Sequence, residues 1–161
     1  MRRLLSVLAL CLMGCASQPS PPPAPPPLPS PGDDVREAAF RYLFQDNASG
    51  LKQRARFYCL EVEGGADASP ALLARLADVG VRVVPASRCV KDAKDGVTEQ
   101  PSGDRPGLVF RIEAIRKVGP GRVDVDAGYY EAGLSASGET LEMVREGQAW
   151  KVTADRRRWI S

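Results

Sequence analysis

The chain of 161 residues contains no histidine, and only 6% of its residues are aromatic. Without histidine, Ser-His and Cys-His nucleophile pairs and histidine-based proton transfer are excluded. The commonest zinc ligand is missing as well. We therefore predict a protein without catalytic residues, metal ligands or a cofactor.

The chain also lacks an excess of charge of either sign, with 22 Lys+Arg against 20 Asp+Glu. Arg2 and Arg3 precede an apolar run over residues 4–13, which has the layout of a signal peptide. This run is too short for a transmembrane helix, which needs about 20 apolar residues. Removal of residues 1–14 would take away both arginines and no acid, leaving 20 basic and 20 acidic residues. Such a balance argues against binding to nucleic acid.

The signal segment ends in the motif LMGC over residues 12–15. This motif resembles the lipobox of bacterial lipoproteins, and the resemblance implies that Cys15 is diacylated and becomes the first residue after cleavage. Because Ala16 and Ser17 follow, rather than aspartate, the chain is similar to lipoproteins of the outer membrane. We therefore expect a lipid-anchored protein of the bacterial cell envelope that faces the periplasm. An ordinary signal peptide with a chance cysteine, or an apolar first helix, is the alternative.

Residues 16–32 read ASQPSPPPAPPPLPSPG, in which nine of seventeen residues are proline. Proline fixes φ and lacks a backbone donor, so this composition favours an extended polyproline II spacer of about 50 Å. A peptide that docks in an aromatic groove is the alternative interpretation.

Of the four cysteines, Cys11 would leave with the signal peptide and Cys15 would carry lipid. Cys59 and Cys89 remain, in a compartment where disulfides persist. We predict that these two residues form a disulfide; two buried free thiols are the alternative.

Residues 33–161 are predicted to form one α+β domain. Helical spacing and capping residues predict helices from Asp33 to about Asn47 and from Ser69 to Gly80. Alternation predicts strands at residues 55–62 and 81–84, and then a meander that includes residues 108–114, 122–127, 140–144 and 150–155. Residues 91–107 and 134–138 are expected to be loops, the first of them mobile. The expected architecture is two helices packed on a curved antiparallel sheet that ends in a four-stranded meander.

The last hairpin, residues 147–152, reads GQAWKV. It resembles the G-x-W-x-V ending of nuclear-transport-factor-2-like and cystatin-like folds, with one extra residue. Residues 128–130, 133–138 and 158–161 also look like those of small uncharacterised exported lipoproteins. These resemblances imply a cone-shaped sheet around the helices, and they imply no particular activity.

Two groups of residues are candidate contact sites. Tyr129 and Tyr130 could line a pocket with Asp124 and Asp126, since some cone-fold enzymes polarise a carbonyl with a Tyr/Asp pair. Strict alternation, however, places both aspartates on the face opposite the valines, where they would be solvated.

The second group lies at the chain end, where Arg156, Arg158 and Trp159 could contact lipid head groups, the cell wall or an acidic partner. A solvated terminal strand is the alternative. The leading hypothesis is a non-enzymatic accessory module that binds an envelope protein or the cell wall. The alternative is a small-ligand-binding or isomerase-like cone with a tyrosine-lined pocket.

Overall fold

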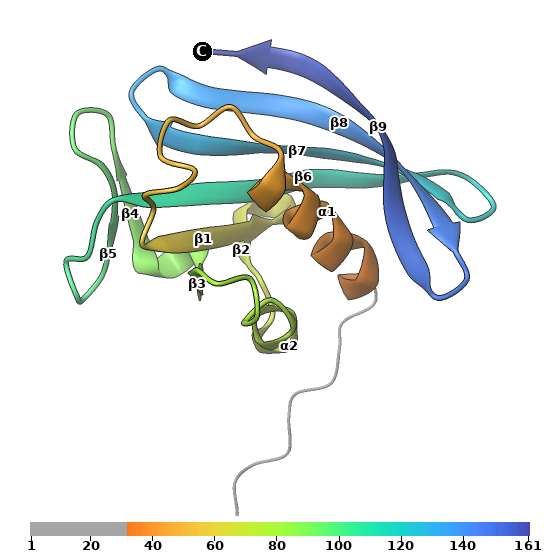
Figure 1. Cartoon of the computed structure of the whole chain (residues 1–161), viewed down its shortest axis with the longest axis horizontal. Helices are drawn as coiled ribbons and strands as arrows, with labels where there is room; N and C mark the ends of the chain where they lie inside the picture. The colour runs from red at the N-terminus through yellow and green to blue at the C-terminus, as the bar shows by residue number, and fades with distance from the viewer. Residues whose placement is uncertain (1–31) are drawn as a thin grey trace, which may run out of the picture.

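The computed structural model describes residues 32–161 (Figure 1). The predicted signal peptide, Cys15 and residues 16–31 of the predicted spacer lie outside the described residues. Within residues 32–161 the chain forms two α-helices and one open sheet of nine strands. No helix in this range is both long and apolar enough to cross a bilayer.

The helices are α1 (Asp33–Gln45) and α2 (Pro70–Arg75), with short 3₁₀ turns η1 (Glu63–Gly65) and η2 (Ala86–Arg88). The strands are β1 (Phe57–Val62), β2 (Ala66–Asp67), β3 (Arg82–Pro85), β4 (Cys89–Asp92), β5 (Gly96–Glu99), β6 (Gly107–Gly119), β7 (Arg122–Ala132), β8 (Ser135–Glu146) and β9 (Ala149–Ile160).

Four long strands, β6 to β9, form the predicted antiparallel meander, and the main path of the sheet runs β2-β1-β6-β7-β8-β9. This confirms the α+β class. The prediction of an antiparallel sheet is wrong, because β1 pairs in parallel with both β3 and β6. The chain returns from β1 to β3 through α2, and such a crossover connection allows parallel neighbours.

A hairpin occupies much of the stretch predicted to be a loop at residues 91–107. Strands β4 and β5 pair with each other, and Val97 of β5 pairs with Gly107 of β6. Val97 is 1% exposed and Glu99 has no exposed surface, so the loop prediction is wrong for these residues. The few apolar residues between the glycines and prolines are enough to attach this hairpin to the sheet.

The predicted loop at residues 134–138 is also shorter than expected, since β8 begins at Ser135.

The close approach of strands at Gly128 explains why glycine is needed there. A Cβ at this position would overlap the backbone carbonyl of Ser137 on the neighbouring strand.

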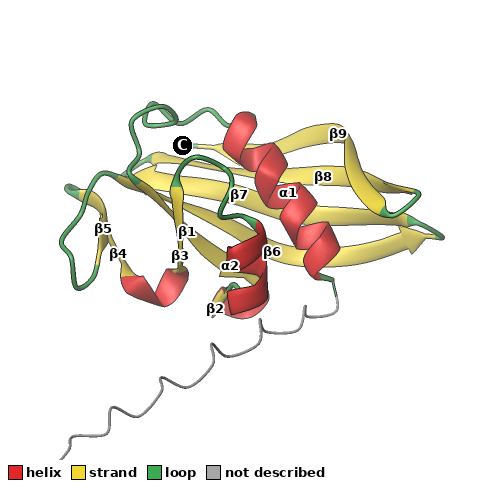
Figure 2. Cartoon of the chain, turned by 60° about the horizontal axis from the view of Figure 1, so that its bottom comes forward, coloured by secondary structure: helices red, strands yellow, loops and turns green. Residues whose placement is uncertain are grey.

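Helix α1 lies across one face of the meander, as Figure 2 shows. We call this the inner face and the opposite face of β6–β9 the outer face. The main core fills the inner face with residues at the predicted helical and alternating positions: Val35, Ala39, Phe40, Leu43, Phe44, Tyr58, Leu60, Leu72, Leu76, Leu108, Phe110, Ile112, Val125, Leu141 and Met143. The helical and alternating spacing of the sequence therefore placed most of this core correctly.

Strand β1 is covered on both faces, as its sequence predicts. Tyr58 and Leu60 enter the main core, whereas Phe57 and Cys59 enter a smaller cluster on the other side with Val97 and other residues of β3, β5 and β6. Gly107 lies against the ring of Phe57, where a Cβ would not fit.

The two ends of the long strands differ in what surrounds them. At one end, the β6–β7 and β8–β9 hairpins lie close to the first turns of α1, so the described chain begins there (Figures 1 and 2). We call this the hairpin end. The opposite end carries the β7–β8 turn and the C-terminus, which pairs with Ala136.

Candidate functional site

The outer face of the meander carries an exposed tryptophan near the C-terminus. Trp159 pairs with Gly138 across β8 and β9, and its indole covers the site where Gly138 lacks a side chain. The guanidinium of Arg111 lies 5.4 Å from the centre of the indole ring, within range of a cation–π interaction. Because 39% of Trp159 remains exposed, the structure presents this ring to solvent in a fixed position.

Ion pairs lie along the outer face near this end of β9. Arg158 lies 2.7 Å from Glu113, and Arg156 lies 3.0 Å from Glu142. Both predicted contact arginines therefore lie on the outer face, Arg158 next to Trp159 in the chain and Arg156 further along β9, and both are held by acidic neighbours. Exposed pairs of this kind stabilise a fold by only about 0–1 kcal/mol each, so their main effect is to order the surface.

The most strongly held carboxylate on this face is Asp126. It forms a two-bond ion pair with Arg116 and accepts a hydrogen bond of 2.7 Å from Thr140. These contacts, chiefly the bonds from Arg116, lower the pKa of Asp126 to about 2. As alternation predicts, Asp126 and Asp124 face away from the main core; each nevertheless has an arginine within ion-pair distance.

Tyr129 and Tyr130 do not share a pocket, because neighbouring residues of a strand point to opposite faces. Tyr129 lies in the main core and is only 2% exposed. Tyr130 packs against the smaller cluster on the other face, and its hydroxyl donates a 3.3 Å hydrogen bond to the carbonyl of Asp92. The two tyrosines therefore do not form the predicted pocket with Asp124 and Asp126.

A group of acidic residues lies on the inner face near the end of α1. Glu139 of β8 is 4% exposed, accepts a hydrogen bond from Ser137, and has a second carboxylate oxygen without a hydrogen-bond partner among the described residues. Burial raises the pKa of Glu139. The sequence analysis missed this residue, although Glu139 alternates in step with Leu141 and Met143 along β8 and therefore shares their inward face.

The same region contains a tyrosine between two carboxylates. The hydroxyl of Tyr42 lies 3.0 Å from Asp46 and 3.2 Å from Asp155, and it has one proton to donate. Burial raises the pKa of Asp155, and the charge of Asp46 acts in the same direction. We call Tyr42, Glu139 and Asp155 the inner acidic group; its members hold protons to a higher pH than isolated acids do.

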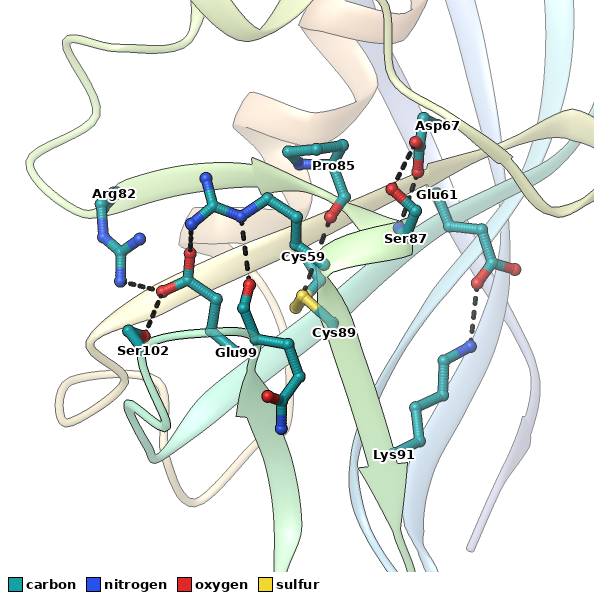
Figure 3. Close-up of a disulfide and its surroundings, with 12 residues drawn as sticks. Cys59, Glu61, Asp67, Arg82, Pro85, Ser87, Cys89, Lys91, Glu99 and Ser102 are labelled. Carbon is teal, nitrogen blue, oxygen red and sulfur yellow. Dashed lines mark hydrogen bonds and ion pairs between the residues drawn. A yellow bond between two sulfur atoms is a disulfide. The ribbon is translucent and has the colours of Figure 1, made fainter.

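A different arrangement surrounds the disulfide between Cys59 and Cys89, which the structure confirms (Figure 3). Glu99 of β5 has no exposed surface, and its carboxylate pairs with Arg82 and Arg88. Ser102 donates a further hydrogen bond of 3.0 Å. Together these contacts, with the bond from Arg82 the largest, lower the pKa of Glu99.

A serine and a lysine in the loop after α1 have a Ser-x-x-Lys spacing that the sequence analysis did not mark. The hydroxyl of Ser49 donates a 2.7 Å hydrogen bond to Glu131 and accepts one from the backbone of Leu51. Both bonds position the hydroxyl within the loop, so the geometry assigns Ser49 a structural part. Lys52 lines an open hollow beside it.

Comparison with protein-family models, with curated proteins and with solved structures found no match. Within residues 32–161, no group of three or more acidic or cysteine side chains is arranged to hold a metal ion.

Proposed function

We propose that the chain is a lipid-anchored protein of the bacterial cell envelope whose domain binds another envelope component without catalysing a reaction. The observation that carries this proposal is the exposed ring of Trp159, which Gly138 and Arg111 hold in place on an ordered, charged face. Aromatic residues with an arginine beside them are the side chains that most often dominate protein interfaces. The anchor at Cys15 and the proline-rich spacer of about 50 Å would carry this face away from the bilayer.

The experiment is crosslinking in intact envelopes followed by recovery of the protein with its partners. Native protein is compared with Trp159→Ala and with Leu134→Ala, which removes a side chain that is 82% exposed elsewhere on the surface. We expect Trp159→Ala to lose at least half of the crosslinked partner and Leu134→Ala to keep it. Recovery of the same partner by both variants would place the contact elsewhere.

The anchor is tested separately with Cys15→Ala. This variant should no longer take up labelled fatty acid, and its crosslinks should fall because it is not held beside the partner. Labelling that persists in the variant would rule out Cys15 as the lipidated residue.

A second candidate, a small-ligand-binding or isomerase-like domain, has one observation in its favour. Tyr129 and Glu139 lie within electrostatic range of each other on the inner face, and burial raises the pKa of both groups. A ligand would have to open the core, since Tyr129 is 2% exposed. Ligand-induced thermal shifts that disappear in both Tyr129→Phe and Glu139→Gln would favour this candidate over the first.

A further inference from the structure

A surface groove of about 350 Å³ lies at the hairpin end, on the part of the inner face that α1 does not cover. Ile115, Val123 and Trp150 supply its apolar side chains. Its other side chains are Lys117, Arg122 and Arg145 from the two hairpins. The groove thus combines an apolar floor with a cationic rim, and its lining contains no acidic residue.

The cations of this groove lack an ion pair, whereas ten of the fifteen arginines in residues 32–161 form one. These ten arginines contact acidic side chains: Arg36, Arg41, Arg75, Arg82, Arg88, Arg105, Arg111, Arg116, Arg156 and Arg158. Within residues 32–161, by contrast, no ion pair reaches Lys117, Arg122 or Arg145. Three cations held together without an anion form a local positive field.

A second hollow, of about 300 Å³, provides an internal comparison, because it shares Trp150 with the groove. Its charged residues come from α1 and α2, and they are already paired. Arg75 lies 2.6 Å from Asp34, and Arg41 lies 2.9 Å from Glu37. The charge on one side of Trp150 is therefore satisfied within the domain, and the charge on the other side is available to a ligand.

Two further features indicate which anion fits. Val118, at the tip of the β6–β7 hairpin, is 52% exposed, so an apolar side chain projects beside the cations. The described chain also starts at this end, where Asp34, Glu37 and Ala38 of α1 line the hollow next to Trp150. Tryptophan and exposed apolar residues beside Lys and Arg are the combination that contacts a bilayer surface.

We propose that the groove binds the anionic head groups of phospholipids at the surface of the membrane that anchors the chain. The inference rests on the anchor of the proposed function. It adds a second, electrostatic contact that orients the domain with its hairpin end toward the bilayer. The chain outside the described residues can reach about 50 Å as an extended spacer, which also allows the domain to lie on the same surface. The proline-rich residues 16–31 suit this groove less well, because they contain no acidic residue to meet its cations.

The test uses the complete lipidated protein in vesicles whose acyl chains are brominated and quench nearby tryptophan. A Trp159→Phe background leaves Trp150 as the only tryptophan, since the chain contains two, and excitation at the red edge of the tryptophan band avoids the tyrosines. Vesicles of phosphatidylcholine are compared with vesicles that also contain phosphatidylglycerol. We expect Trp150 to be quenched only in the anionic vesicles and to recover as salt screens the contact.

The cations are tested with the triple variant Lys117→Gln/Arg122→Gln/Arg145→Gln. Each cation near an anionic surface changes the ratio of docked to undocked domain about fivefold, so quenching should largely disappear. The matched control is Arg54→Gln/Arg56→Gln/Lys94→Gln, which removes the same charge from exposed residues elsewhere on the domain and should keep the quenching.

Several results would overturn the inference. These are equal quenching in both kinds of vesicle, equal loss in the triple variant and its control, or a Trp150 response to soluble peptidoglycan fragments that needs no anionic lipid. Shielding of Trp150 from aqueous acrylamide in neutral vesicles would instead show that residues 16–31 cover the groove. Flotation of the protein with vesicles reports the lipid anchor, and envelope crosslinking reports the partner, so failure of the groove is distinguishable from failure of the proposed function.

Discussion

Glu99 and Glu139 are both buried carboxylates on strands of one sheet, yet their surroundings are opposite. Glu99 pairs with two arginines, and its pKa is lowered. Glu139 has a single hydroxyl donor, and burial raises its pKa. Desolvation by burial raises the pKa of both acids; the net direction depends on whether paired cations outweigh it, as Arg82 and Arg88 do for Glu99.

The two regions also differ in what they hold together. The region of Glu99 attaches the β4–β5 hairpin to β3 and η2, and the Cys59–Cys89 disulfide fixes the same hairpin to β1. The inner acidic group lies where α1 meets β9, and within residues 32–161 no disulfide and no ion pair with arginine reaches its carboxylates. The ionised carboxylate therefore stabilises the first region, whereas the second region is more stable when its carboxyl groups are protonated.

The largest expected effect comes from removing the disulfide with Cys59→Ala/Cys89→Ala. The cysteines are 30 residues apart. Removing a cross-link that closes a loop of this size lowers the free energy of unfolding by about 3–4 kcal/mol. Urea unfolding measures the change, and reduced native protein is the control that should match the variant. A loss below about 1 kcal/mol would show that Glu99 and its arginines hold the hairpin without the cross-link.

A smaller loss is expected from Glu99→Gln, which leaves Arg82 and Arg88 beside an uncharged amide. We expect a loss of about 2 kcal/mol at neutral pH, because both arginines reach solvent in part and recover some hydration.

The pH dependence gives the sign of this contribution. The folded-state pKa of Glu99 is below its unfolded value, so its stabilisation is present at neutral pH and is lost as the pH falls below the ordinary glutamate range. The difference between native protein and Glu99→Gln should therefore shrink in acid. A difference that is constant with pH would mean that the side chain acts through packing alone.

The smallest effect, and one of opposite sign, is expected from Glu139→Gln. The folded-state pKa of Glu139 is raised, so the native carboxyl costs stability as the pH rises from the ordinary glutamate value through the raised one. The variant should gain about 1 kcal/mol at neutral pH and nothing in acid. Unfolding at several pH values tests this, and a variant that is destabilised at neutral pH would contradict the difference between the two regions.

Much of the fold could be predicted from local patterns. The alternation in β1 placed Tyr58 and Cys59 on opposite covered faces, and the cysteine count identified the disulfide partner Cys89. These predictions succeed because the strand period and cysteine chemistry are properties of short segments. Parallel pairing of β1 with β6 has no such local signal, since the paired residues are fifty positions apart.

The candidate site was harder to predict for the same reason. Trp159 and the arginines beside it stood out in the sequence, but their acidic partners lie on other strands. Glu99 lies among glycines and prolines, which indicate a polar loop. The alternation of Val97 and Glu99 is the only local sign that this segment joins the sheet, and the arginines that pair with Glu99 lie on other elements, β3 and η2.

The contact between α1, the first described element, and β9, the last, also determines when the domain can finish folding during synthesis. The hydroxyl of Tyr42 in α1 lies beside Asp155, which is 113 residues later in the chain. A chain that is made from its amino end can pack α1 on β1, α2, β6 and β7 first, and the part of α1 that contacts β9 stays uncovered until β9 has emerged. Completion of the fold then depends on contacts between residues that are distant in sequence. Truncation within β9 would leave apolar surface exposed, which makes the domain prone to aggregation, proteolysis and chaperone binding.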